Sequence, residues 1–209
     1  MSKPDLMVLA QEERADLLAL LEELSAEQWI APTLCTQWRV RDVATHVVSY
    51  DELSVPSLVG TFVRGGLRGG GVNDVALERY QGLEPAAIVE LVSRNLRPSG
   101  LPSGFGGGIA LTDGTIHHQD IRRALGLPRS IPAHRLVPVL DFALGAPTLP
   151  AKRNAKGLRL TATDVDWTSG DGPEVSGPGE AVLMAIAGRP QALGELSGPG
   201  VPTLRERVG

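Results

Sequence analysis

The chain has 209 residues, of which 42% are hydrophobic and 21% charged, and its formal net charge is −4. This composition is ordinary for a soluble globular protein, and the length suits one domain or one domain with a smaller appendage. A negative net charge argues against a nucleic-acid or anionic-membrane partner, because both require a basic face.

No apolar run approaches the roughly 20 residues that a membrane span requires, and the N-terminus lacks the apolar core of a secretory signal. The single cysteine, Cys35, cannot form an internal disulfide bond. These features together favour a cytoplasmic protein.

Hydrophobic residues recur at helical spacing through the first two thirds of the chain. Helices are therefore expected over residues 5–24, 40–54, 73–80, 83–96, a segment ending at 124, and 133–144. Ser25 and Gln28 have the spacing of a capping box that opens a short turn. The glycine-rich stretches 65–71 and 98–108 are expected to be breaks or flexible loops.

The pattern changes after residue 150. Residues 158–164 alternate apolar and polar side chains, as a half-buried strand does, and residues 174–176 are expected to form a return strand after a turn. A short apolar helix follows over 180–187. The fold class expected is therefore mainly α: a helical bundle over residues 1–150 and a small α+β C-terminal domain over 151–209.

Asp113 and His117 are the most informative pair of residues. Their spacing of four places both on one face of a helix, about 6 Å apart along its axis. With His46 from another helix, they offer two imidazoles and one carboxylate, the donor set of a catalytic zinc-type centre that keeps one position open. The alternative is that Asp113 caps the helix and His117 is an ordinary, partly buried imidazole. His118 lies about 100° around the helix from His117, so both cannot easily face one ion.

Three further residues have both a functional and a structural interpretation. Asp120 could orient a metal ligand, although an intrahelical pair with Arg123 is slightly favoured. Cys35 could be a nucleophile, but no neighbour in sequence lowers its pKa, so a buried thiol is favoured. Arg189 could bind a carboxylate, although a charge complementing a helix C-terminus is favoured.

The motifs resemble a known family. The stretch from Cys35 to His46, which includes Trp38 and Asp42, resembles the N-terminal signature of the mycothiol-dependent maleylpyruvate isomerase family, which is related to the DinB-like metalloproteins. The stretch 113–126 resembles the second signature, an acid followed four residues later by a histidine and then by an aspartate. The tail around Arg189 resembles the family's small C-terminal domain, and the bundle is accordingly expected to be a DinB-like four-helix bundle.

The resemblance implies a function for these residues. His46, Asp113 and His117 would bind a divalent metal, zinc in particular, and Arg189 is the positional match for an arginine that assists catalysis in the family. The family uses mycothiol, a low-molecular-weight thiol, whose thiolate adds to a small electrophilic substrate. Release of the thiol after bond rotation gives isomerisation, and its retention gives S-transfer. The partners expected are thus a thiol and a small molecule, and the protein is expected to be a monomer or homodimer.

One departure from the family keeps two alternatives open. The family's acid is usually glutamate, and the carboxylate of Asp113 lies closer to the backbone by one carbon–carbon bond, roughly 1.5 Å. A non-catalytic metal-binding or regulatory bundle protein is therefore one alternative. The other is a metal-assisted hydrolase, in which water rather than a thiol takes the open position.

Overall fold

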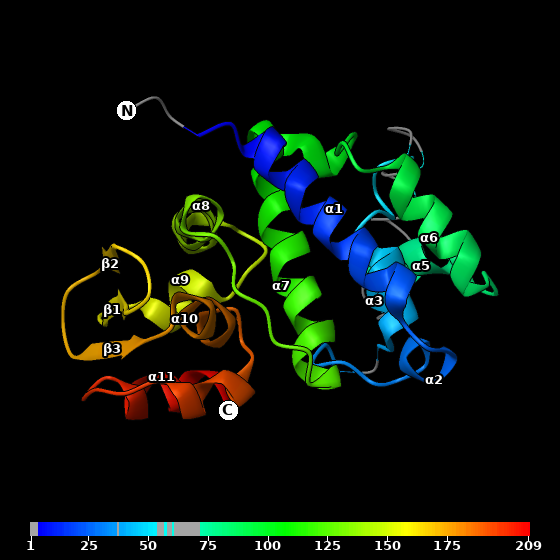
Figure 1. Ribbon diagram of the computed structural model, residues 1–209. Coiled ribbons are helices and arrows are strands. Elements are labelled where there is room, and N and C mark those ends of the chain that lie inside the picture. The colour runs from blue at the N-terminus through cyan, green and yellow to red at the C-terminus, as the bar shows by residue number, and fades with distance from the viewer. Residues whose placement is uncertain (1–3, 37, 54–56, 58–59, 61–71) are drawn as a thin grey trace. The chain divides into compact units, whose positions relative to one another are not determined.

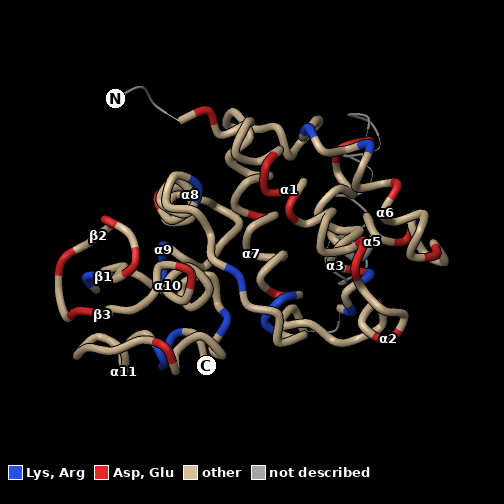
Figure 2. Tube along the Cα trace, in the orientation of Figure 1, with Lys and Arg blue, Asp and Glu red and all other residues tan. Residues whose placement is uncertain are grey.

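The computed structural model describes residues 4–36, 38–53, 57, 60 and 72–209. The chain is mainly helical with a three-stranded sheet, which confirms the predicted fold class (Figure 1). It divides into two compact units, Met1–Pro128 and Arg129–Gly209. Charged residues of both signs are interspersed along the elements of each unit (Figure 2). Within the described part of the chain, no helix combines the length and apolarity needed to cross a membrane.

The first unit contains the predicted bundle. Its elements are α1 (Leu6–Glu23), α2 (Ala26–Trp29), α3 (Val40–His46), α5 (Val72–Leu77), η1 (Glu78–Tyr80), α6 (Pro85–Arg94), η2 (Leu101–Gly107) and α7 (Gly108–Leu125). Helices α1 and α3 each contact both α6 and α7, so these four helices surround a common core. Leucine, valine and isoleucine side chains fill that core, and their burial provides the main stabilisation of the unit.

Local sequence signals explain where several helices begin. The carboxylate of Asp5 accepts hydrogen bonds from the backbone N–H groups of Met7 and Val8, which caps α1. The capping box of Ser25 and Gln28 is present and opens α2. Pro85 occupies the first turn of α6, where its missing N–H costs no intrahelical hydrogen bond.

The helix predicted over residues 40–54 is shorter than expected, because α3 ends at His46 and turns follow. The cause lies outside the segment. The buried Arg14 guanidinium on α1 donates to the Val47 carbonyl (3.0 Å) and makes two 2.8 Å bonds to the Asp51 carboxylate. These bonds hold residues 47–51 against α1 in a non-helical path.

The stretch 98–108, predicted to be a flexible loop, instead includes the 3₁₀ element η2 packed against α1. Gly107 has a φ of +94° and lies so close to α1 that a Cβ there would be 2.7 Å from the Met7 Cα. Glycine is required at such a position. The predicted break at 65–71 lies outside the described residues.

The second unit combines helices with the small sheet. Its elements are α8 (Ala133–Gly145), α9 (Ala151–Ala155), β1 (Arg159–Ala162), β2 (Trp167–Ser169), β3 (Glu174–Gly177), α10 (Gly179–Ile186), η3 (Pro190–Glu195) and α11 (Val201–Val208). The strand order is β2-β1-β3, with β2 antiparallel and β3 parallel to β1. The strand expected over 174–176 exists as β3, but it runs parallel to β1 and does not return antiparallel to it. The antiparallel neighbour of β1 is β2, which the sequence analysis did not predict.

The structural division falls at Pro128, whereas the sequence analysis placed the domain boundary after residue 150. The difference is α8, which was assigned to the bundle. In the structure α8 packs against α9 and α10, and its Asp141 carboxylate accepts a 2.8 Å hydrogen bond from the Trp167 indole of β2. Periodicity identified the helix but could not identify what its apolar face packs against.

Candidate metal centre

Helix α7 places Asp113 and His117 on one face. The helix begins at Gly108, five residues before Asp113, so the interpretation of Asp113 as a capping residue is wrong. The Asp113 Oδ1 and His117 Nε2 atoms are 3.5 Å apart. Backbone hydrogen bonds of a regular helix therefore set the spacing between the two groups.

His46 reaches the same place from the last residue of α3. Its Nε2 lies 3.8 Å from the Asp113 Oδ1, and its ring centroid is 4.9 Å from that of His117 with the planes nearly perpendicular. The three potential ligand atoms all lie within 4.8 Å of one another. The structure thus brings together the three residues singled out from the sequence.

The three side chains differ in exposure. His46 and His117 are buried, whereas the Asp113 side chain is 39% exposed. Removal from water would raise the pKa of Asp113, but the adjacent His117 and His46 imidazoles, with a smaller effect of Arg14, hold its pKa well below the ordinary value. The carboxylate is thus an anion at neutral pH, which is the form that binds a cation.

Asp120 lies against the other nitrogen of His117. Its Oδ2 is 3.0 Å from the His117 Nδ1, and the carboxylate is fully buried. This is the orienting arrangement that the sequence analysis weighed against an intrahelical pair. A carboxylate on Nδ1 fixes the ring and leaves the Nε2 lone pair directed at the candidate centre.

Cys35 is also close to this group. Its sulfur lies within 4.8 Å of potential ligand atoms of His117 and Asp120, forming a second cluster of metal-ligand type. The Nδ1 atom of His117 already contacts Asp120. The sequence offered no sign of this proximity, because the contacts connect a loop before α3 with α7.

Trp38 forms a wall of the centre that sequence reasoning missed. The sequence analysis named Trp38 only as part of the N-terminal signature. Its ring centroid lies 4.8 Å from that of His46 and 6.0 Å from that of His117, and Tyr50 contacts His46 edge-on at 6.1 Å. These rings limit the motion of the two imidazoles and reduce the access of water to them.

Arg189 belongs to the second unit. It precedes η3, and its guanidinium donates a 2.8 Å hydrogen bond to the Ala187 carbonyl. Its predicted catalytic role stays a prediction.

The donor set fits a divalent metal. Both Nε2 atoms face the same carboxylate oxygen of Asp113, and among the described residues neither has another hydrogen-bonding partner. Two imidazole nitrogens and one carboxylate oxygen suit zinc and similar ions. The fold and this cluster define a class: helical-bundle proteins with a candidate three-ligand metal centre and a small α+β unit.

Comparison with known proteins gives a family match within the first unit. Residues 10–98 match the model of the mycothiol maleylpyruvate isomerase N-terminal domain. This match agrees with the resemblance noted in the sequence, and residues 10–98 are thus similar to the N-terminal domain of this family.

Solved structures support the same fold over nearly the whole chain. The crystal structures of a mycothiol-dependent maleylpyruvate isomerase and of a histidine-to-alanine mutant are each 14% identical to this chain, with TM-scores of 0.54 and 0.61. Each comparison covers 93% of this chain and 91% of the other. At this identity the similarity concerns the fold. No curated protein matches the sequence.

Proposed function

We propose that this protein is a divalent-metal-binding enzyme, with zinc as the metal and mycothiol as the thiol cosubstrate, that isomerises or S-transfers a small electrophilic substrate. The convergence of His46, Asp113 and His117 from two helices carries the proposal. The family of the N-terminal domain supports the choice of thiol.

The ligand atoms assigned are the Nε2 atoms of His46 and His117 and a carboxylate oxygen of Asp113. A metal bound there supplies positive charge that stabilises a thiolate at neutral pH. Asp120 holds the His117 ring in position, and Trp38 covers both imidazoles. The exposed part of Asp113 marks the side from which a thiol reaches the centre.

Arg189 is assigned a supporting role, which is binding an anionic group of the substrate. A guanidinium suits that role because it stays charged and can bind a carboxylate with two parallel hydrogen bonds. Replacing Arg189 with lysine tests it. Loss of turnover with unchanged metal content supports the assignment, and unchanged turnover contradicts it.

Metal analysis tests the centre itself. Purified protein is expected to retain zinc after dialysis, whereas His46→Ala and His117→Ala lose it. The exposed His134, in the second unit, provides the control substitution His134→Ala, which should retain zinc. Unchanged metal content in both ligand variants would remove the basis of the proposal.

A conjugation assay then tests the chemistry. Mycothiol and a small electrophile are supplied with and without zinc, and product formation is expected only when thiol, metal and protein are all present. Bound zinc without turnover of any electrophile would indicate the non-catalytic alternative. Hydrolysis of an ester in the absence of thiol would indicate the hydrolase.

A further inference from the structure

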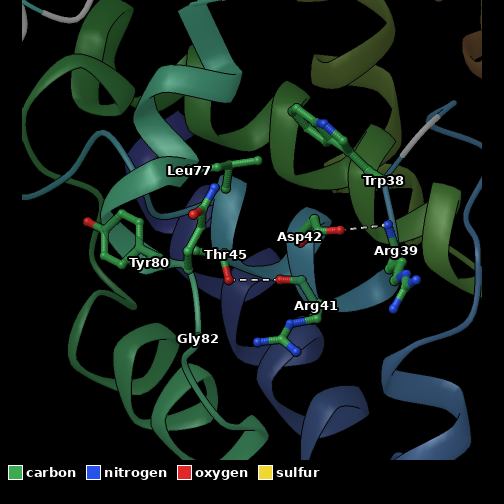
Figure 3. Close-up of a pocket in the computed structure, with 9 residues that line it drawn as sticks. Trp38, Arg39, Arg41, Asp42, Thr45, Leu77, Tyr80 and Gly82 are labelled. Carbon is green, nitrogen blue, oxygen red and sulfur yellow. Dashed lines mark hydrogen bonds between the residues drawn. The ribbon is translucent and has the colours of Figure 1, made fainter.

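A cavity of about 430 Å³ lies beside the candidate metal centre, within the first unit. The start of α3 and the turn around η1 form its walls (Figure 3). Its lining includes Trp38, Arg39, Arg41, Asp42, Leu77 and Tyr80. Cavities of this size hold small molecules, and none of the ligands assigned to the metal centre lines it.

The charges of this cavity do not balance. Among the described residues, the Arg39 guanidinium has no hydrogen-bond or ion-pair partner, and Arg41 donates only to the neutral Leu83 carbonyl, at 2.5 Å. The Asp42 carboxylate accepts the backbone N–H of Arg39 at 2.9 Å (Figure 3). Two guanidinium groups against one carboxylate leave one net positive charge, which a monoanion would neutralise.

The rest of the lining combines apolar or aromatic side chains with the polar Thr45 and Gln81. Trp38 and Tyr80 contribute rings, and Leu77 contributes an aliphatic side chain (Figure 3). Flat apolar groups pack well against aromatic faces. The cavity therefore offers both cationic donors and a surface for an apolar body.

We propose that this cavity is a binding site for a small monocarboxylate that carries an aromatic or other apolar body. The carboxylate pairs with Arg39 and Arg41, since guanidinium groups match carboxylates in geometry and charge, and the body packs against Trp38 and Tyr80. The proposal goes beyond the metal-dependent function and does not rest on it.

Ligand-observed NMR titration tests the site, with benzoate as the probe and metal-free, EDTA-treated full-length protein. Benzoate is expected to bind saturably, and neutral benzyl alcohol at least tenfold more weakly, because it lacks the charge. Arg39→Ala is expected to weaken benzoate binding about tenfold or more. Arg97→Ala is the matched control, because Arg97 is an exposed arginine of the same unit that does not line the cavity.

A second variant, Arg41→Gln, keeps a donor for the Leu83 carbonyl and should also weaken binding. Thermal unfolding of each variant verifies that it is folded. Several outcomes would overturn the proposal: no saturable binding of benzoate, equal binding of benzyl alcohol, or equal affinities of the Arg39 and Arg97 variants. Binding that requires added zinc would also overturn it, because the carboxylate would then be on the metal.

Discussion

Two adjacent histidines of α7 lie in opposite environments. His117 directs its Nε2 toward the partly exposed Asp113. His118 is fully enclosed, with its Nδ1 2.9 Å from the Glu13 Oε1 and its Nε2 accepting a 2.8 Å hydrogen bond from the Arg122 guanidinium.

The difference lies in the nitrogen lone pairs. Because Arg122 can only donate, the His118 Nε2 must accept, and its Nδ1 then carries the proton that Glu13 accepts. No lone pair remains for a cation. His117 has a carboxylate on one nitrogen only, so its other nitrogen can bind a metal. The occupancy of the second nitrogen thus separates a structural histidine from a candidate ligand.

The largest effect on stability is expected from removing Glu13, which contacts the enclosed His118. Glu13→Ala removes the carboxylate that accepts from the buried His118 imidazole and leaves a cavity, and should lower the free energy of unfolding by about 3 kcal/mol. Denaturant titration measures this change. Glu22→Ala, at an exposed position of the same helix, should change little. A Glu13 variant as stable as the Glu22 variant would contradict a structural role for this contact.

Removing Asp113, the acid of the candidate metal centre, should instead reduce metal affinity. Asp113→Ala is expected to weaken zinc binding by about 100-fold, roughly 2.7 kcal/mol, with little loss of stability because the side chain is partly exposed. Competition with a chromogenic chelator measures the affinity. Asp113→Glu, which restores the acid usual in the family, should retain zinc. Equal zinc affinity of the alanine variant and the unmodified protein would show that Asp113 is not a ligand.

Removing the charge of the orienting carboxylate should have a smaller effect. Asp120→Asn keeps the shape and an acceptor for the His117 Nδ1, and should weaken zinc binding about tenfold. The same chelator competition measures it. An affinity as low as that of the Asp113 alanine variant would indicate that Asp120 is itself a ligand, as in the cluster with Cys35.

Replacing Gly114, which lies on α7 just before the two histidines, should slightly stabilise the protein. Gly114 lies inside α7, and a Cβ there would be in ordinary contact with the Glu13 Cγ at 3.7 Å and a Val47 methyl group at 3.9 Å. Gly114→Ala should therefore increase the free energy of unfolding by up to about 1 kcal/mol through helix propensity. Thermal unfolding measures it, and a clear loss of stability would show that α7 and α1 cannot tolerate the methyl group.

The smallest effect is expected at the exposed ion pair between Arg94 and Glu52. Hydrogen bonds from Arg94 and Asn95 hold the pKa of Glu52 below its ordinary value. A depressed acid contributes stability above its unfolded pKa and loses it as the pH falls through the folded pKa. Glu52→Gln should thus slightly lower the melting temperature at pH 7, and the difference should vanish below about pH 4. A difference that persists at pH 3 would indicate a contact independent of charge.

Local sequence signals were sufficient for much of the fold. Periodicity and capping residues located α1, α6 and α7 because these helices depend mainly on their own sequences and on one apolar face. The end of α3 was misplaced because Arg14, more than thirty residues away, takes the Val47 carbonyl. The parallel pairing of β1 and β3 was missed because strand order depends on partners that periodicity does not specify.

Some residues of the candidate site could likewise be predicted from local sequence, and others could not. Asp113 and His117 could be paired from their spacing, since a helix converts that spacing directly into proximity. The positions of Trp38 and Cys35 beside them could not, because both come from a loop whose path depends on tertiary packing. His46 was joined to that pair as a second imidazole from another helix, and its place in the family signature then strengthened the choice.

The placement of Asp113 inside a regular helix has a consequence for metal binding. Two of the three proposed ligands are carried by one continuous helix, so an arriving ion finds them already spaced, with little conformational entropy left to lose. His46 completes the set from the end of a separate short helix, where the Trp38 and Tyr50 rings pack against it. We therefore expect zinc binding to require little rearrangement of α7.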